Sequence, residues 1–187
     1  MNVEFHEAAH ALAAYVYNVP IQSVSTYKKD GEAGRLRAKP GASSTELNTA
    51  ALLVAGQLAE KRALGDREVF NWFNDDDTDT RNACVMVDAI VEGGGFEGNL
   101  FAARHFVELK ARSLLVTKWR AVEAIAAALR KSKRLTGDEV VTICRRKGVR
   151  RLGELTKDEV LARLTPEGKR NFLGTVGPDG KTMIIKR

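Results

Sequence analysis

The chain has 187 residues, of which 44% are hydrophobic and 29% are charged, and its formal net charge is +6. This length and composition predict one globular domain, or one domain with a small appendage, that can bury a sizeable core. No apolar run approaches the length of a membrane-spanning helix, and the acidic, polar start is unlike a signal peptide, so neither a membrane-spanning nor a secreted protein is expected. The two cysteines, Cys84 and Cys144, lie far apart and are expected as free thiols, which favours a cytoplasmic location.

Much of the positive charge lies in two clusters, residues 130–134 and 145–151. Such clusters can bind nucleic acid or acidic lipid, or they can complement the negative ends of helix dipoles. No aromatic residues alternate with these charges, as they do on many surfaces that bind nucleic acid. We therefore favour helix-terminal positions for the clusters and expect no nucleic-acid partner.

The first predicted element is an alanine-rich helix over residues 3–17, which contains the sequence HEAAH at residues 6–10. Residues i and i+4 share one face of a helix, so His6 and His10 can bind the same metal ion. Glu7 then lies beside any water at that ion and can accept its proton. The motif predicts a zinc-hydrolase site, with a helix that merely carries two partly buried histidines as the alternative.

Two strands and a second helix are predicted next. Pro20 ends the first helix, and the β-branched, roughly alternating residues 21–27 predict a strand. A turn signal, Asp30-Gly31, leads to a second short strand over residues 33–38. Residues 44–64 carry an apolar face at helical spacing and predict a helix.

An acidic, aromatic loop over residues 66–78 precedes a third helix, predicted over residues 79–92. A long helical stretch, residues 99–130, is expected to break once. A capping box opens a short helix over residues 136–146.

The composition changes after Gly148. Residues 156–164 predict a helix that begins with a second capping box, and residues 172–186 predict a β-hairpin. We therefore expect a mainly α fold with a small β-element over residues 1–148, followed by a C-terminal appendage of one helix and a hairpin over residues 149–187.

A catalytic zinc usually takes three protein ligands and a water, so one more ligand is expected. The zincin pattern HExxHxxGxxH is excluded because Ala13 and Val16 stand where its glycine and third histidine would be. Glu32 and Glu46 lie at suitable sequence distances but lack the ExxxD setting of the glutamate zincins. His105 lies on a helix of ordinary amphipathic pattern, so it is not favoured either.

An acidic cluster before the third helix is a better source of the ligand. Its carboxylates repel one another unless they cap a helix or meet a cation. A solvated loop with one helix cap is the alternative, and it would account for three of the four residues. The cluster consists of Asp75, Asp76, Asp77 and Asp79.

The chain resembles the peptidase domain of the FtsH-type, membrane-anchored ATP-dependent zinc metalloproteases. The opening FHEAAHAL is similar to the family's HEAGHAL, and further blocks follow in the family's order and spacing over residues 3–147. The resembling blocks are residues 5–12, 21–35, 54–65, 79–91 and 111–140.

The resemblance implies a zincin peptidase fold in which Asp79, at the start of its block, is the third zinc ligand. It also implies that Glu60 lies near the metal and orients a histidine ligand, with an exposed helix charge as the alternative. The strand after the turn is similar to the family's strand, which suggests that it holds an extended peptide by β-augmentation. This substrate-binding segment comprises Ala33, Gly34, Arg35 and Leu36.

Two of the departures from the family pattern bear on function. Ala9 replaces the family's glycine, which is a small change on a helix. No segment resembles the family's ATPase module or membrane anchor, so threading of folded substrates is not implied and a separate ATPase is a candidate partner. Family members form hexamers, so a homo-oligomer is one expectation and a monomer or dimer is the alternative.

These observations predict a zinc metalloendopeptidase that hydrolyses peptide bonds in unfolded proteins or peptides. The expected cofactor is Zn²⁺, held by His6, His10 and Asp79, with Glu7 as the catalytic base. One alternative is a catalytically idle binding or adaptor module of the same fold, which would have no chemical need for Glu7. The other is a nucleic-acid-associated protein that uses its basic clusters.

Overall fold

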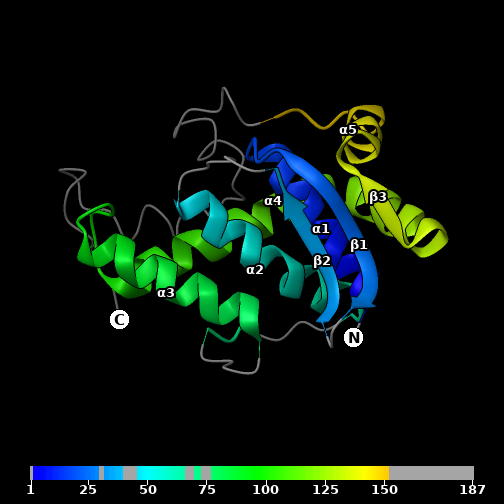
Figure 1. Cartoon of the computed structure of the whole chain (residues 1–187). Coiled ribbons are helices and arrows are strands. Elements are labelled where there is room, and N and C mark those ends of the chain that lie inside the picture. The colour runs from blue at the N-terminus through cyan, green and yellow to red at the C-terminus, as the bar shows by residue number, and fades with distance from the viewer. Residues whose placement is uncertain (1, 30–31, 40–45, 66–69, 73–76, 152–187) are drawn as a thin grey trace.

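The computed structural model describes residues 2–29, 32–39, 46–65, 70–72 and 77–151. Over these residues the chain is mainly helical with a small antiparallel sheet, as its sequence predicts. The expected C-terminal helix and hairpin lie outside the described residues. The elements in chain order are α1 (Val3–Val16), β1 (Ile21–Lys29), β2 (Glu32–Ala38), α2 (Glu46–Ala63), α3 (Thr78–Glu92), α4 (Leu100–Ser132), β3 (Arg134–Thr136) and α5 (Gly137–Arg146) (Figure 1).

Three of the described helices, α3, α4 and α5, begin at a polar side chain that accepts a hydrogen bond from a free backbone amide. Asp77 caps α3, and Asn99 caps α4 in the same way. α5 opens with the predicted capping box, in which Thr136 and Glu139 exchange hydrogen bonds with each other's backbone. α4 bends once, at Lys118, whose φ of −125° and ψ of 20° are not helical, so the expected break is confirmed.

The sheet has the strand order β2-β1-β3, and β1 pairs antiparallel with both neighbours. β3 is absent from the sequence-based prediction, because three residues are too few to show a period of two. The chain returns to the sheet after α4, where Leu135 lies opposite Val24 and both side chains are buried. β2 is therefore an edge strand within the described residues.

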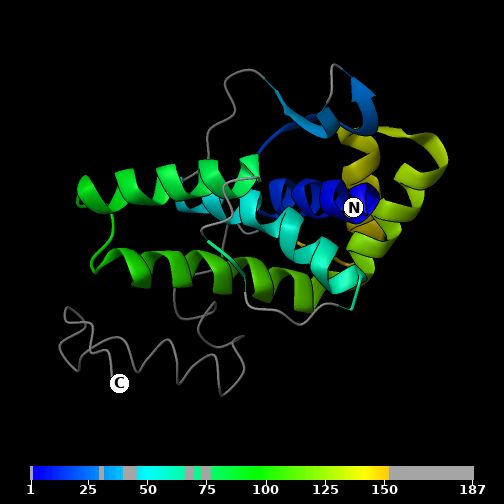
Figure 2. The same cartoon turned by 90° about the horizontal axis from the view of Figure 1, so that it is seen from below.

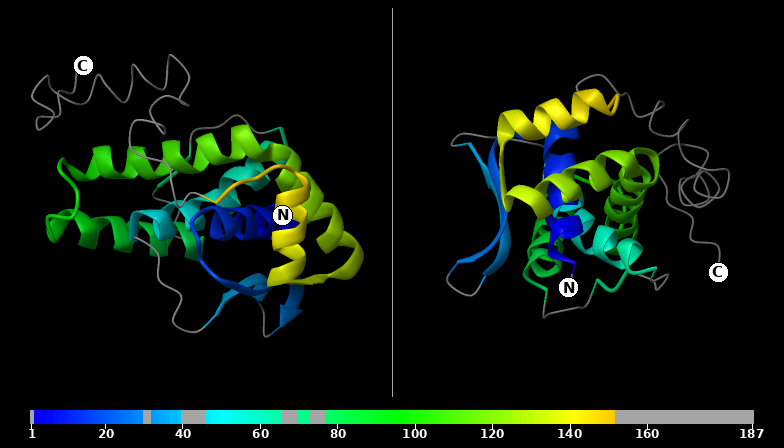
Figure 3. Two further views of the ribbon diagram at one scale, coloured as in Figure 1. Left: turned by 90° about the horizontal axis from the view of Figure 1, so that it is seen from above. Right: turned by 90° about the vertical axis from the view of Figure 1, so that its right-hand side faces the viewer.

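α1 lies at the centre of the molecule, and its residues from His6 to Val16 are all buried. The sheet lies on one side of α1, and α2 and α4 lie on the other (Figure 3). Figure 2 shows α3 running antiparallel to the first part of α4. The HEAAH motif is thus part of the core.

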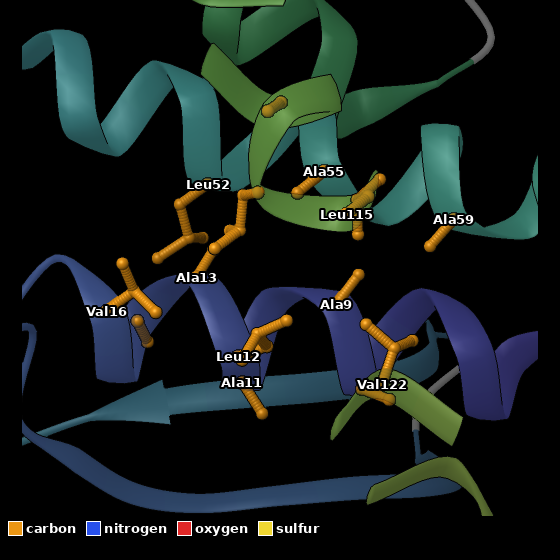
Figure 4. Packing of buried hydrophobic residues seen from close by; sticks show 14 of the residues in the cluster. Ala9, Ala11, Leu12, Ala13, Val16, Leu52, Ala55, Ala59, Leu115 and Val122 are labelled. Atoms are coloured by element: carbon orange, nitrogen blue, oxygen red, sulfur yellow. The ribbon is translucent and has the colours of Figure 1, made fainter. Parts of the chain in front are cut away.

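Small side chains make this close packing possible. Figure 4 shows Ala9 and Ala13 on the side of α1 that faces α2, with Ala55 and Ala59 on the opposing helix, and all four are fully buried. The distance between two packed helices depends on the side chains at their contact, so alanines allow a close approach. This approach brings the α2 backbone next to the histidines of α1.

Three further expectations concern thiols, charge and membranes. Cys84 and Cys144 form no disulfide, as predicted. The basic residues 130–131 and 145–146 lie in the last turns of α4 and α5, where they complement the helix dipoles. In the described part of the chain, no helix has both the length and the apolar character needed to cross a membrane.

Candidate metal centre

Three side chains from two helices converge on one point. Nε2 of His6 and Nε2 of His10 lie 2.9 Å apart, as expected for positions i and i+4 on α1. Oδ2 of Asp79, in the first turn of α3, lies 3.2 Å from Nε2 of His6 and 3.0 Å from Nε2 of His10. A tetrahedral zinc ion with bonds of about 2.0–2.1 Å spaces its ligand atoms about 3.3–3.4 Å apart. The triangle is slightly tighter than this spacing, and the donor set fits zinc.

The backbone of α2 holds the ring of His10. Nδ1 of His10 lies 2.8 Å from the carbonyl oxygen of Leu52, to which it donates a hydrogen bond. This bond places the ring proton on Nδ1 and leaves the lone pair of Nε2 facing Asp79 and His6. Sequence reasoning missed Leu52, because its contribution is a backbone carbonyl that any residue could supply.

Glu60, also on α2, lies beside the other histidine. Its Oε2 lies 3.6 Å from Nδ1 of His6, slightly beyond hydrogen-bond distance, on the side of the ring away from Asp79. Its Oε1 accepts a hydrogen bond of 2.7 Å from the backbone amide of Asn2. The Glu60 side chain is only 16% exposed, so it is not a solvated helix charge.

The carboxylates and the histidines of the site shift one another's pKa values. Burial lowers the pKa of His6, but Asp79 and Glu60 outweigh burial and raise this pKa to about 10. Burial raises the pKa of Asp79, but the two histidines outweigh burial and hold it well below its usual range. The site thus favours extra positive charge, which a proton or a divalent cation can supply.

Glu7 lies between the histidines and the sheet. Its side chain is buried, and its Oε2 has no hydrogen-bond partner among the described residues. A Cβ atom at Gly34 of β2 would collide with Oε1 of Glu7, so the carboxyl group packs directly against this strand. Gly34 also has a φ of +89°, which side-chain-bearing residues rarely adopt. The structure therefore places the predicted base next to the predicted substrate strand.

Gly56 of α2 has a role that the sequence did not indicate. A Cβ atom at this position would lie 2.5 Å from Nε2 of His10 and 2.8 Å from Nε2 of His6. Only a hydrogen in place of a side chain leaves room for both imidazoles. The residue lies within a block that resembles the FtsH-type family, but the reason for a glycine appears only once α1 and α2 are packed together.

Gly56→Ala is expected to weaken zinc binding by more than about tenfold, because the methyl group displaces ligand atoms. Alanine is favoured over glycine inside a helix by about 1 kcal/mol, so helix propensity alone would predict a harmless change. Zinc affinity measured by competition with a chromophoric chelator checks this, with Gly93→Ala in the C-cap of α3 as the control. Unchanged affinity in Gly56→Ala would show that the imidazoles do not depend on this space.

Among the other candidates from the sequence, those whose side chains the structure describes do not join the group. Asp75 and Asp76 lie outside the described residues, and Asp77 caps α3. Glu46 and His105 are exposed on α2 and α4. Where the structure describes the chain, the one cluster of histidine, cysteine or acidic side chains with metal-binding geometry is the triad of α1 and α3.

No family model matches the chain, and no curated protein matches it. The resemblance to FtsH-type peptidase domains therefore stays a prediction, carried by the order and spacing of the sequence blocks. The geometry of the triad does not depend on that resemblance.

Proposed function

We propose that this chain is a zinc-dependent metallopeptidase that hydrolyses peptide bonds in unfolded proteins or peptides. The supporting observation is the convergence of His6, His10 and Asp79, with the carboxyl group of Glu7 buried close enough for their charges to act on it. The sequence blocks that resemble the FtsH-type peptidase domain, in the same order and spacing, support the same function.

The triad would hold the ion between α1 and the first turn of α3. When bound, zinc would polarise the scissile carbonyl and make water a better nucleophile at neutral pH. The side chain of Asp79 is 30% exposed, whereas those of His6 and His10 are 7% and 6% exposed. Substrate and water would therefore reach the centre from the side of Asp79.

Glu7 would move the protons of the reaction. Burial raises the pKa of its carboxyl group above the ordinary value, against the opposing effect of His10 and His6. A carboxyl group shifted in this direction is better suited to accept a proton from water and pass it to the leaving amine. Its Oε2 makes no hydrogen bond within the described part of the chain that would commit it to a structural role.

The edge strand β2 would hold the substrate. We place an extended peptide along Ala33, Gly34, Arg35 and Leu36, where backbone hydrogen bonds can add a strand to the sheet. The contact between Gly34 and Glu7 brings this strand next to the base. Backbone pairing accepts many sequences, as a peptidase of unfolded proteins requires.

Removing the metal tests the function directly. The purified protein is expected to carry about one zinc per chain, to lose casein hydrolysis on treatment with a chelator, and to regain it when zinc is restored. Metal analysis and a fluorescent casein assay measure the two properties. Full zinc content without hydrolysis of any unfolded substrate would instead support the idle binding module.

Glu60→Gln tests the orientation of His6. The change keeps the size of the side chain but removes the negative charge beside Nδ1, so zinc affinity is expected to fall by about 10- to 100-fold. Glu123→Gln, at an exposed position on α4, removes the same charge elsewhere and serves as the control in the chelator competition. Equal affinities of the two variants would argue against an orienting role.

A further inference from the structure

The two faces of β2 differ in chemistry. Gly34 and Leu36 point towards α1, since a Cβ atom at Gly34 would meet Glu7 and the side chain of Leu36 packs against the core. Successive side chains of a strand point to opposite faces. Arg35 and Arg37 therefore lie on the outer face of the sheet, and both are exposed.

A third arginine extends this basic face across the sheet. Arg35 lies opposite Ser25 of β1, and Ser25 lies opposite Arg134 of β3. Arg37 lies opposite Ser23, whose Oγ accepts a hydrogen bond of 3.5 Å from Nη2 of Arg134. Small hydroxyl side chains thus separate the arginines. We call Arg35, Arg37 and Arg134 the arginine face.

The arginine face adjoins the edge of the sheet that would receive the substrate. β2 is an edge strand of the described sheet, and Figure 1 shows it on the side of the sheet nearer to α2. An open hollow of about 460 Å³ follows this strand, lined by Gln22, Arg35, Leu36, Arg37 and Ala38. The hollow gives room for side chains of an added strand beside the two arginines of β2.

We propose that the substrates are acidic peptides, with Asp or Glu at every second position of the segment bound along β2. A peptide paired with β2 continues the alternation of the sheet, so every second side chain lies on the arginine face. Directly opposite side chains of paired strands have Cβ atoms about 4.5–5.5 Å apart, and opposite charges at this distance stabilise the pair. The intervening side chains face Glu7 and α1, where there is no comparable positive charge on β2.

A peptide fits this surface better than a nucleic acid does. The strand edge next to Arg35 and Arg37 presents backbone donors and acceptors at the spacing of an extended peptide. A nucleic acid would use the positive charge but not these backbone groups. The inference rests on the proposed function, because it names the substrate class of the same site.

Two peptides that are identical except at alternate positions test the proposal. One has Glu at these positions and the other has Gln. We expect the protein to cleave the Glu peptide with a kcat/KM about 3- to 30-fold higher, since two exposed ion pairs together contribute in this range. The double variant Arg35→Gln, Arg37→Gln should lose this preference, because kcat/KM should fall more for the Glu peptide than for the Gln peptide. The preference should also decrease as salt is raised.

A matched control removes two exposed arginines from α4, in the double variant Arg120→Gln, Arg130→Gln, and should keep the preference. Equal cleavage of both peptides by the unmodified protein would overturn the proposal. An equal loss of activity on both peptides in the Arg35, Arg37 variant would overturn it as well, because it would indicate a structural role.

Binding separates this proposal from the proposed function. Fluorescence anisotropy with the labelled peptides and the Glu7→Gln variant measures recognition without cleavage. If the unmodified protein cleaves neither peptide but the Glu peptide binds selectively, the result would support the arginine face and contradict hydrolysis. Cleavage of both peptides with no preference for the Glu peptide would support hydrolysis and contradict the arginine face. Displacement of the Glu peptide by a single-stranded oligonucleotide at much lower concentration would overturn the peptide assignment in favour of nucleic acid.

Discussion

Glu7→Gln is expected to lower kcat for casein or an unfolded-protein substrate by about 10²- to 10⁴-fold, the usual contribution of a positioned general base. Zinc content should remain unchanged, because His6, His10 and Asp79 are untouched. Glutamine has nearly the shape of glutamate and fits the same space against Gly34. It cannot accept the proton of water, so the loss should appear in kcat rather than in KM.

The matched control for this variant is Glu4→Gln on the same helix. The carboxylate of Glu4 lies 3.9 Å from Nζ of Lys133, outside the triad, so its loss should leave hydrolysis intact. Stability should not fall in Glu7→Gln, since the change removes a buried carboxyl group whose pKa burial raises. Normal turnover in Glu7→Gln would contradict the assignment of the base.

Asp79→Ala is expected to release the metal. The triad would lose one of three ligands, so zinc affinity should fall by more than the roughly 10- to 100-fold typical of losing a residue that only orients a ligand. Hydrolysis should disappear with the zinc at ordinary metal concentrations. Chelator competition gives the affinity, and metal analysis after gel filtration gives the content.

Two further variants on α3 make this test specific. Asp79→Asn keeps the shape of the side chain and should also bind zinc weakly, because a neutral amide is a poorer ligand than a carboxylate. Asp88→Asn removes a carboxylate of α3 that pairs with Arg104 of α4, and this variant should bind zinc normally. Retention of zinc by both Asp79 variants would mean that another residue completes the site.

Much of the fold could be predicted because its signals are local. The capping box of Thr136 and Glu139, and the side chains of Asp77 and Asn99, set helix starts through contacts within a few residues. The strand β3 could not be predicted in this way. Its three residues become a strand only because α4 returns them to β1, which is a contact between distant parts of the chain.

The candidate site also combines local features, which the sequence predicts, with contacts between distant residues, which it does not. The pairing of His6 with His10 follows from helical periodicity alone, as does the place of Glu7 beside them. Asp79 lies 73 residues after His6, so periodicity does not distinguish it from the other acids of its cluster, and only the family resemblance of its block pointed to it. Asp77 caps the helix while Asp79, two residues later, reaches the histidines. Gly56 depends wholly on helix packing, so periodicity gave no sign of it.

The burial of α1 has a consequence for which ions the centre would accept. A helix packed on all sides cannot shift to suit its ligand, so the donor atoms are preorganised near the spacing of a small tetrahedral ion before it arrives. Ca²⁺ requires six to eight oxygen ligands at about 2.3–2.6 Å, which two imidazoles and one carboxylate cannot supply. The donor set would therefore select against hard, larger cations, and preorganisation would lower the entropic cost of binding the ion that fits.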